Sequence, residues 1–289
     1  MQQSEPFGKR SSIPDKSCAP HGRRRLAVLF WCLTLGVACP PLFAADKPAQ
    51  EEDEADRQPP EIQDVIDFAE ASREALKGVQ DYTAVFSKVE IVGRRKIEQQ
   101  MQIKIREKPF SVYLRYLTGP EAGREVLYVA GANNGNLLVH EVGIKAVAGT
   151  VPLPPTDRKV MEENRHPITQ IGMSNLLTTA FKIWDVEKKY DPQTVDIKFF
   201  PNAKLAGTAC DAVQITHQKQ QRDLPFHMSR VYFDKELKLP VRAERYAWPQ
   251  RKGEQPPLVE SYTYSKIKTN VGLTDQDFSP RNPQYGFRR

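Results

Sequence analysis

The amino-acid sequence predicts an α+β fold: a strongly curved antiparallel sheet of about eleven strands, a half-barrel, covered by an N-terminal helix and an inserted helix. Three observations support this prediction. After Tyr82, apolar and polar residues alternate with period two over most of the chain, which is typical of strands with one buried face. Two stretches have helical spacing instead, at residues 62–76 and 173–184. Short links containing Gly, Pro or Asn separate the strands, as between antiparallel neighbours.

The first 45 residues predict a secretory signal peptide. The basic run Arg23–Arg25 precedes the apolar run Leu26–Ala38, which is the order of charge and hydropathy in such signals. We expect cleavage near Ala44 or Ala45 and release into the periplasm or the medium. A spanning helix needs about 20 apolar residues, so the shorter run favours cleavage over a retained anchor. Lipid attachment at Cys39 is a less favoured alternative, because the residues before it match a lipobox only loosely.

Charge is distributed unevenly along the chain. The net charge of the whole chain is +6, and removing the six basic and two acidic residues of the signal peptide lowers it to +2. Residues 46–60 are acidic, contain proline and have few large apolar groups, so we expect a flexible tether. A single domain over residues 61–289 follows it. Nucleic-acid binding is disfavoured, whereas peripheral contact of a mildly basic surface with anionic lipid headgroups stays open.

The first helical stretch places Ile62, Val65 and Ala69 on one face, and Gly78 lies near a suitable end for that helix. Strands are then expected from Tyr82 onward, with turns at positions rich in Gly, Pro and Asn. After the run that begins at Tyr82, the expected strands cover residues 97–105, 111–117, 124–130, 136–142, 145–150, 193–200, 208–216, 228–235, 238–248 and 258–268. Between the sixth and seventh strands, a proline-rich loop beginning at Pro152 leads to the inserted helix.

The inserted helix carries an apolar stripe that either packs in the core or lines a ligand cavity. The candidate cavity-lining residues are Met173, Leu176, Leu177, Phe181 and Trp184 on this stripe, with Val112 and Leu114 on a strand. Three cationic side chains are candidates for holding an anionic headgroup: Arg115, Arg165 and His166. Arg165 and His166 precede the inserted helix, where they either bind an anion or bond loop carbonyls. Arg115 either binds a headgroup, pairs with a carboxylate or borders the sheet.

No catalytic motif stands out in the sequence. It contains no nucleophile elbow, no zinc-protease motif, no phosphate loop and no paired-cysteine metal site, so we expect no cofactor and no metal. The histidines after the signal peptide lie on separate elements without ligand spacing. Cys210 falls within an expected strand and is interpreted as a buried, inert thiol. A carboxylate pair for glycoside cleavage stays open as a minor alternative.

Five segments carry a resemblance: Tyr82–Lys88, Pro109–Leu114, Gly123–Val126, Arg165–Thr169 and Asn270–Asp275. They resemble a family of exported bacterial domains, the domain of unknown function 1571, and the resemblance spans roughly residues 62–287. More remotely, the order of helix, strands, inserted helix and strands is similar to lipoprotein carriers of the LolA and LolB type and to the sensor domain of RseB. That resemblance implies a LolA-like half-barrel that binds acyl chains, although the acidic tether is not part of the carrier pattern.

Taken with this resemblance, the sequence predicts an exported, non-catalytic monomer that binds a lipid, an acyl chain or a lipoprotein in an apolar concavity of the cell envelope. An envelope protein-interaction or sensor domain with a packed interior is the main alternative, and its partner would be another envelope protein. A polymer hydrolase is less favoured. The interior volume of the fold is the observation that separates the first two hypotheses.

Overall fold

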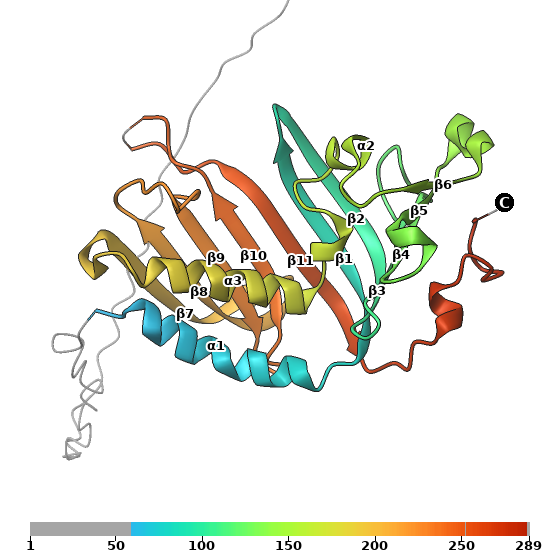
Figure 1. Ribbon diagram of the computed structural model, residues 1–289. Coiled ribbons are helices and arrows are strands. Elements are labelled where there is room, and N and C mark those ends of the chain that lie inside the picture. Colours follow the sequence, from blue (N-terminus) through green and yellow to red (C-terminus); the bar gives the residue numbers. More distant parts are fainter. Residues whose placement is uncertain (1–58, 252, 288–289) are drawn as a thin grey trace, which may run out of the picture. The chain divides into compact units, whose positions relative to one another are not determined.

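The described residues, 59–251 and 253–287 of this computed structural model, form one antiparallel sheet with helices on its concave side (Figure 1). The sheet has eleven strands in the order β6-β5-β4-β3-β2-β1-β11-β10-β9-β8-β7. The predicted α+β class, the strand number and the two covering helices are confirmed. The signal peptide at 1–45 and the tether at 46–60, apart from its last two residues, lie outside the described residues and stay predictions.

The sheet is built from two runs of consecutive strands. The bounds are β1 (Asp81–Val92), β2 (Arg95–Arg106), β3 (Ser111–Tyr116), β4 (Glu125–Val129), β5 (Leu137–His140), β6 (Thr150–Leu153), β7 (Val195–Leu205), β8 (Thr208–His217), β9 (Met228–Asp234), β10 (Pro240–Tyr246) and β11 (Leu258–Thr269). Strands β1–β6 form one meander and β7–β11 form another. Pairing of β1 with β11 joins the two meanders at the middle of the sheet.

Two long helices cover the β7–β10 half of the sheet: α1 (Ile62–Lys77) and α3 (Met173–Glu187). Their apolar stripes meet the inward side chains of these strands in one core cluster, which buries Val65 and Ala69 of α1 and Leu177 and Trp184 of α3. Figure 1 shows the two helices running side by side across these strands. As expected, α1 ends just before Gly78.

The N-terminus of α3 is fixed by two tyrosine hydroxyls from the centre of the sheet. The amide of Gly172 donates to Tyr264 Oη at 2.9 Å, and the amide of Met173 donates to Tyr82 Oη at 3.0 Å. These bonds satisfy two of the amides that a helix leaves free at its start. Gly172 has φ of 112°, and an added Cβ would lie 3.2 Å from the Tyr82 hydroxyl, so the close approach needs glycine.

The C-terminal segment packs on the opposite face of β3–β5. Tyr113, Leu127 and Leu138 point to that face and contact Phe278 and Phe287. The segment contains the short 3₁₀ helix η5 (Asp275–Phe278). The C-terminal segment therefore does not cover the concave face of β3–β5.

One strand is predicted at the wrong position. Residues 145–150 form most of a 3₁₀ helix, η2 (Gly143–Ala148), rather than a strand, and β6 begins only at Thr150. Gly143 and Gly149 both have positive φ and bound the helical turn, which interrupts the alternation. Pro152, expected to open a loop, lies in β6; a proline is tolerated there because β6 is an edge strand. The other short helices are η1 (Asn133–Gly135), α2 (Arg158–Met161), η3 (Ile168–Gln170) and η4 (Pro192–Thr194).

Candidate ligand cavity

A cavity of about 520 Å³ lies on the concave face of the β1–β6 half of the sheet. It is bounded by part of the segment that connects β6 to α3, and we call residues 158–172 of this segment the strap. Figure 1 shows the strap on the same side of the sheet as α1 and α3. The apolar part of the lining includes Phe86, Met101, Leu114, Val126, Leu137, Val139, Val151, Leu153, Val160, Ile168, Ile171 and Leu176.

The cavity exists because the two halves of the sheet are covered differently. Over β7–β10, two helices of 16 and 15 residues place continuous apolar stripes against the strands and fill the space. The strap contains only a four-residue helix and a three-residue 3₁₀ turn, so it has no long stripe to insert. Space therefore remains between the strap and the strands beneath it.

A pair of buried glutamates lies beside the cavity. Glu90 on β1 and Glu260 on β11 are register partners, and their side chains are 2% and 1% exposed. Two like charges directly opposite each other destabilise a sheet unless other groups compensate them. Lys88 Nζ lies 3.1 Å from Glu90 Oε2, and Arg165 Nε lies 2.8 Å from Glu260 Oε2.

Further donors complete this arrangement. His166 Nε2 lies 3.0 Å from Glu260 Oε2, and Arg245 forms a second ion pair with Glu260. Tyr262 Oη donates to Glu90 Oε1 at 2.6 Å. The cluster of Lys88, Glu90, Arg165, His166, Arg245, Glu260 and Tyr262 is called the charged cluster below. Its fixed charges are three cations against two carboxylates.

Burial and neighbouring groups shift the pKa values of Glu260 and Lys88 in opposite directions, whereas for Tyr262 burial and the neighbouring carboxylates act in the same direction. Burial alone would raise the pKa of Glu260, but the hydrogen bond from His166 and the charge of Arg245 outweigh it and lower the pKa to about 2. Burial lowers the pKa of Lys88, and the adjacent Glu90 partly offsets this effect. Burial, together with the charges of Glu260 and Glu90, raises the pKa of Tyr262, so its hydroxyl stays a hydrogen-bond donor.

A second ionic contact holds the strap at the ends of β4 and β5. Arg124 Nε lies 2.9 Å from Glu141 Oε2, and Arg124 Nη1 lies 2.7 Å from Glu163 Oε2 on the strap. The guanidinium also lies over the ring of Tyr116, 5.3 Å from its centroid. Burial raises the pKa of Tyr116 to about 12. The strap is thus tied to both meanders by charged side chains.

The sequence-predicted residues divide into three groups. Leu114, Leu176 and His166 line the cavity. Arg165 lies beside it but uses its guanidinium on Glu260 and on the carbonyl of Ile91. The remaining residues do not line it: Val112, Met173, Leu177 and Trp184 lie in the packed core clusters, Phe181 packs under Arg73, and Arg115 is exposed.

These differences follow from geometry. One side of the α3 stripe faces β7–β10, so only Leu176, nearer the strap, reaches the cavity. Arg115 follows Leu114 directly, and successive side chains of a strand point to opposite faces. The cationic candidate on β3 therefore points away from the concave face.

Sequence reasoning missed Lys88, Glu90, Arg124, Arg245 and Glu260. A signal for three of them exists in the alternation. Lys88 and Glu90 continue the inward phase of Phe86 on β1, and Arg245 continues that of Ala243 on β10. Charged residues in phase with a buried apolar face are informative, because they need partners inside. The pairing of Glu90 with Glu260 joins residues far apart in sequence, and alternation alone does not reveal it.

Neither a metal cluster nor a membrane-spanning helix is found in the part of the chain that the structure describes. Within 59–251 and 253–287, no group of three or more His, Cys, Asp or Glu side chains is arranged to hold a metal ion. In the same residues, no helix is both long and apolar enough to cross a bilayer.

The family model described as "Protein of unknown function (DUF1571)" matches residues 79–287. The chain belongs to the DUF1571 family. The DUF1571 match includes every strand, the strap and all residues that line the cavity, whereas α1 precedes it. No curated protein matches the chain in sequence.

Solved structures with partial similarity include three that are covered over most of their own length. An uncharacterized conserved protein from Thermus thermophilus has 10% identity and a TM-score of 0.41, covering 75% of this chain and 93% of that one. The lipoprotein LppX from Mycobacterium tuberculosis has 14% identity and a TM-score of 0.41, with 73% and 98% coverage. A LolA superfamily protein from Nitrosomonas europaea has 12% identity and a TM-score of 0.30, with 74% and 96% coverage.

Proposed function

We propose that this DUF1571 domain binds an amphiphile with a long acyl chain, a lipid or an acylated protein, in the cavity beneath the strap. The observation that carries the proposal is the cavity itself, whose 520 Å³ falls within the roughly 300–1,000 Å³ of small-molecule sites. If a methylene group takes up about as much space as a liquid water molecule, roughly 30 Å³, the cavity accommodates one chain of about 17 carbons.

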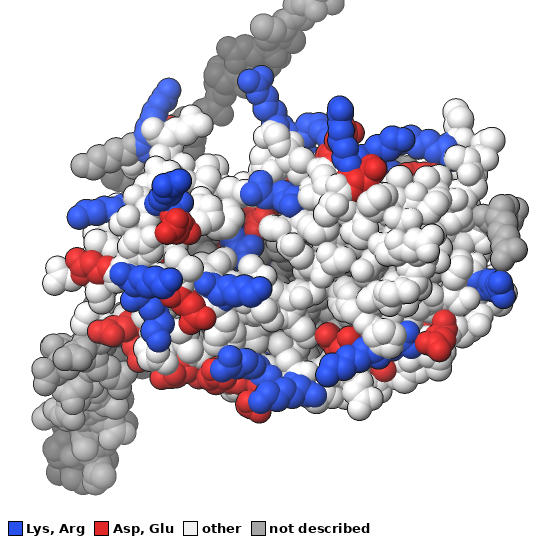
Figure 2. Space-filling view, viewed as in Figure 1, with Lys and Arg blue, Asp and Glu red and all other residues white. Residues whose placement is uncertain are grey.

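The lining supports an amphiphile rather than a plain hydrocarbon. Its floor is apolar, and five groups of the charged cluster also line the cavity: Lys88, Glu90, His166, Arg245 and Tyr262. The excess of one cation in that cluster favours an anionic headgroup at this end. On the face seen in Figure 2, charged side chains gather beside the central hollow, while uncharged residues cover much of the surface over β3–β6.

The cavity favours this function over the alternative of an interaction domain with a packed interior. Both Glu90 and Glu260 are already bonded to cations, which gives no support to a hydrolase with two working carboxylates. We therefore propose binding without turnover. On the basis of the predicted signal peptide, we propose that this binding occurs outside the cytoplasm, in the periplasm or the medium.

Native mass spectrometry of the full chain after gentle extraction, followed by titration with a fluorescent fatty acid, tests the proposal. We expect a co-purifying lipid or uptake of one fatty acid per chain. Leu176→Arg should abolish uptake, because Leu176 lines the cavity. Phe181→Arg is the matched control, since Phe181 is also half-buried on α3 but does not line the cavity. Neither lipid nor uptake in the unaltered chain, with the fold intact, would contradict the proposal.

A further inference from the structure

Two large aliphatic side chains protrude from the 3₁₀ helix η2. Ile144 is 93% exposed and Val147 is 90% exposed, whereas the other exposed large hydrophobic side chains among the described residues are between 37% and 44% accessible. In a 3₁₀ helix, side chains three positions apart are eclipsed, so Ile144 and Val147 project from the same side of the turn. Together they form what we call the apolar tip.

The apolar tip lies at the border of the cavity. Lys145, between the two aliphatic residues, is part of the cavity lining, as is Glu141 at the end of β5. Because β1–β6 form an antiparallel meander, the β1–β2 turn, the β3–β4 turn and η2 all leave the sheet at the same end. Figure 1 shows η2 above β6, at the same end of the sheet as α2.

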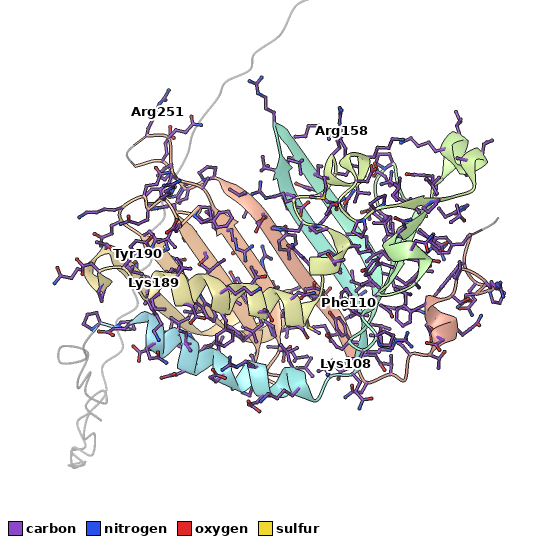
Figure 3. The ribbon with its side chains drawn as sticks, in the orientation of Figure 1. Lys108, Phe110, Arg158, Lys189, Tyr190 and Arg251 are labelled. Carbon is purple, nitrogen blue, oxygen red and sulfur yellow. The ribbon has the colours of Figure 1, made fainter. Side chains whose placement is uncertain are left out.

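Basic side chains accompany the tip. Lys145 belongs to η2, and Lys159 on the strap also lines the cavity. The neighbouring Arg158 has a side chain that is 91% exposed, and its Nε lies 3.0 Å from Oε1 of Glu162. Figure 3 shows Arg158 pointing outward at the opposite end of the sheet from Lys108, which lies in the β2–β3 turn. Aliphatic residues flanked by Lys and Arg are the combination that binds anionic membrane surfaces.

The size of the tip discriminates between a protein and a membrane as its partner. A stable protein interface buries about 800 Å² per partner, which two aliphatic side chains on a protruding turn do not offer. A bilayer imposes no complementary shape and accepts such side chains at the boundary between headgroups and acyl chains. A small apolar tip with a few cations gives weak and reversible attachment, which suits repeated contact.

We infer that Ile144 and Val147 insert into the surface of an anionic lipid bilayer and place the opening of the cavity against it, with Lys145, Arg158 and Lys159 contacting the headgroups. The inference goes beyond the proposed cavity function and does not depend on it. Docking on the membrane requires the apolar tip, whereas ligand binding requires the residues that line the cavity.

Vesicle binding by the full chain tests the inference. The probes are vesicles of phosphatidylcholine alone and of an equal mixture with phosphatidylglycerol. We expect sedimentation with the mixed vesicles, and hydrogen–deuterium exchange that slows locally at residues 143–149 when they are added. The local readout matters because any contribution from the N-terminal residues is common to all variants.

Paired variants give the comparison. The Ile144→Asp, Val147→Asp double variant should bind mixed vesicles about tenfold more weakly or worse, because it loses its apolar burial. The Leu237→Asp, Val271→Asp double variant is the control, since both residues are exposed at the opposite end of the sheet. Lys145→Glu with Lys159→Glu should remove the preference for mixed over neutral vesicles.

Equal binding by both Asp pairs, or exchange at 143–149 that vesicles leave unchanged, would overturn the inference. The result is separable from the test of cavity function. Leu176→Arg should still dock on vesicles, and the Ile144→Asp, Val147→Asp variant should still take up a fatty acid that is dissolved in monomeric form.

Discussion

Replacing Glu260 with glutamine removes the carboxylate that joins the strap to the centre of the sheet. Glu260 is 1% exposed and pairs with Arg165, His166 and Arg245. Its pKa in the folded chain is about 2, compared with an ordinary value of 4.5. The difference between these values corresponds to about 3 kcal/mol of stabilisation of the folded state. Loss of a buried partner, which leaves Arg245 and Arg165 uncompensated, costs a similar amount.

The sign of the pH dependence follows from the lowered pKa. An acid whose pKa is lower in the folded state stabilises the fold fully above its unfolded pKa, and this stabilisation is lost as pH falls through the folded pKa. For Glu260 the window runs from about pH 4.5 down to about pH 2. Glu260→Gln should therefore be less stable by about 3 kcal/mol at pH 7, and the difference should shrink as pH falls through that window.

Urea denaturation at a series of pH values measures this difference, with the unaltered chain and Glu260→Gln compared at each pH. Glu98→Gln is the control, because the side chain of Glu98 is 58% exposed in its pair with Lys96. Its free energy of unfolding should change by less than about 1 kcal/mol. A Glu260→Gln variant as stable as the unaltered chain at pH 7, or a difference that stays constant down to pH 2, would show that Glu260 does not stabilise the fold through its charge.

Three further substitutions test the packing of the domain, each read by thermal or urea denaturation. Leu177→Asp buries a charge in the cluster between α3 and the sheet and should unfold the domain, whereas exposed Thr178→Asp should fold. Gly172→Ala should cost about 1–3 kcal/mol, because φ of 112° is a conformation for glycine; equal stability would contradict this. Gly286→Ala should cost about 1–3 kcal/mol, since its Cβ would lie 2.6 Å from the His140 ring; a neutral effect would show that the ring moves freely.

The periodicity of apolar residues in the sequence predicts most of the fold. The period-two alternation predicts the number of strands, and the apolar stripes that begin at Ile62 and Met173 predict the two helices. Both patterns are regular because an element that buries one face needs apolar residues at a constant spacing. The strand expected at 145–150 fails for a local reason. Its apolar residues belong to a turn bounded by Gly143 and Gly149, and Val147 among them faces solvent rather than a core.

The site depends on contacts between distant strands and helices, and the spacing of apolar residues in the sequence does not reveal these contacts. The α3 stripe predicts that Leu176 and Leu177 are buried, but their assignment to cavity and core depends on which strands lie beneath each. Glu90 and Glu260 become neighbours only through the pairing of the first strand with the last. The sequence leaves open whether Arg165 and His166 bind an anion or bond loop carbonyls. In the structure both contact Glu260, an anion supplied by the chain itself, and Arg165 also donates to the carbonyl of Ile91.

The two halves of the sheet therefore have different roles. The β7–β10 half is packed by α1 and α3, whose apolar stripes fill the space over its strands. The β1–β6 half keeps an open interior under the strap, with the charged cluster on one side and the apolar floor on the other. Variants in the first half should change stability, and variants on the cavity floor should change ligand uptake.

A crystal structure of the chain grown with a brominated fatty acid is the decisive test of ligand binding beneath the strap. The bromine is located independently by its anomalous scattering. We expect one bromine site between the strap and the floor residues Leu114, Val126 and Val139, with the carboxylate toward Lys88 and Arg245. An interior closed by side chains, with bromine found only on the outer surface, would contradict ligand binding in this cavity.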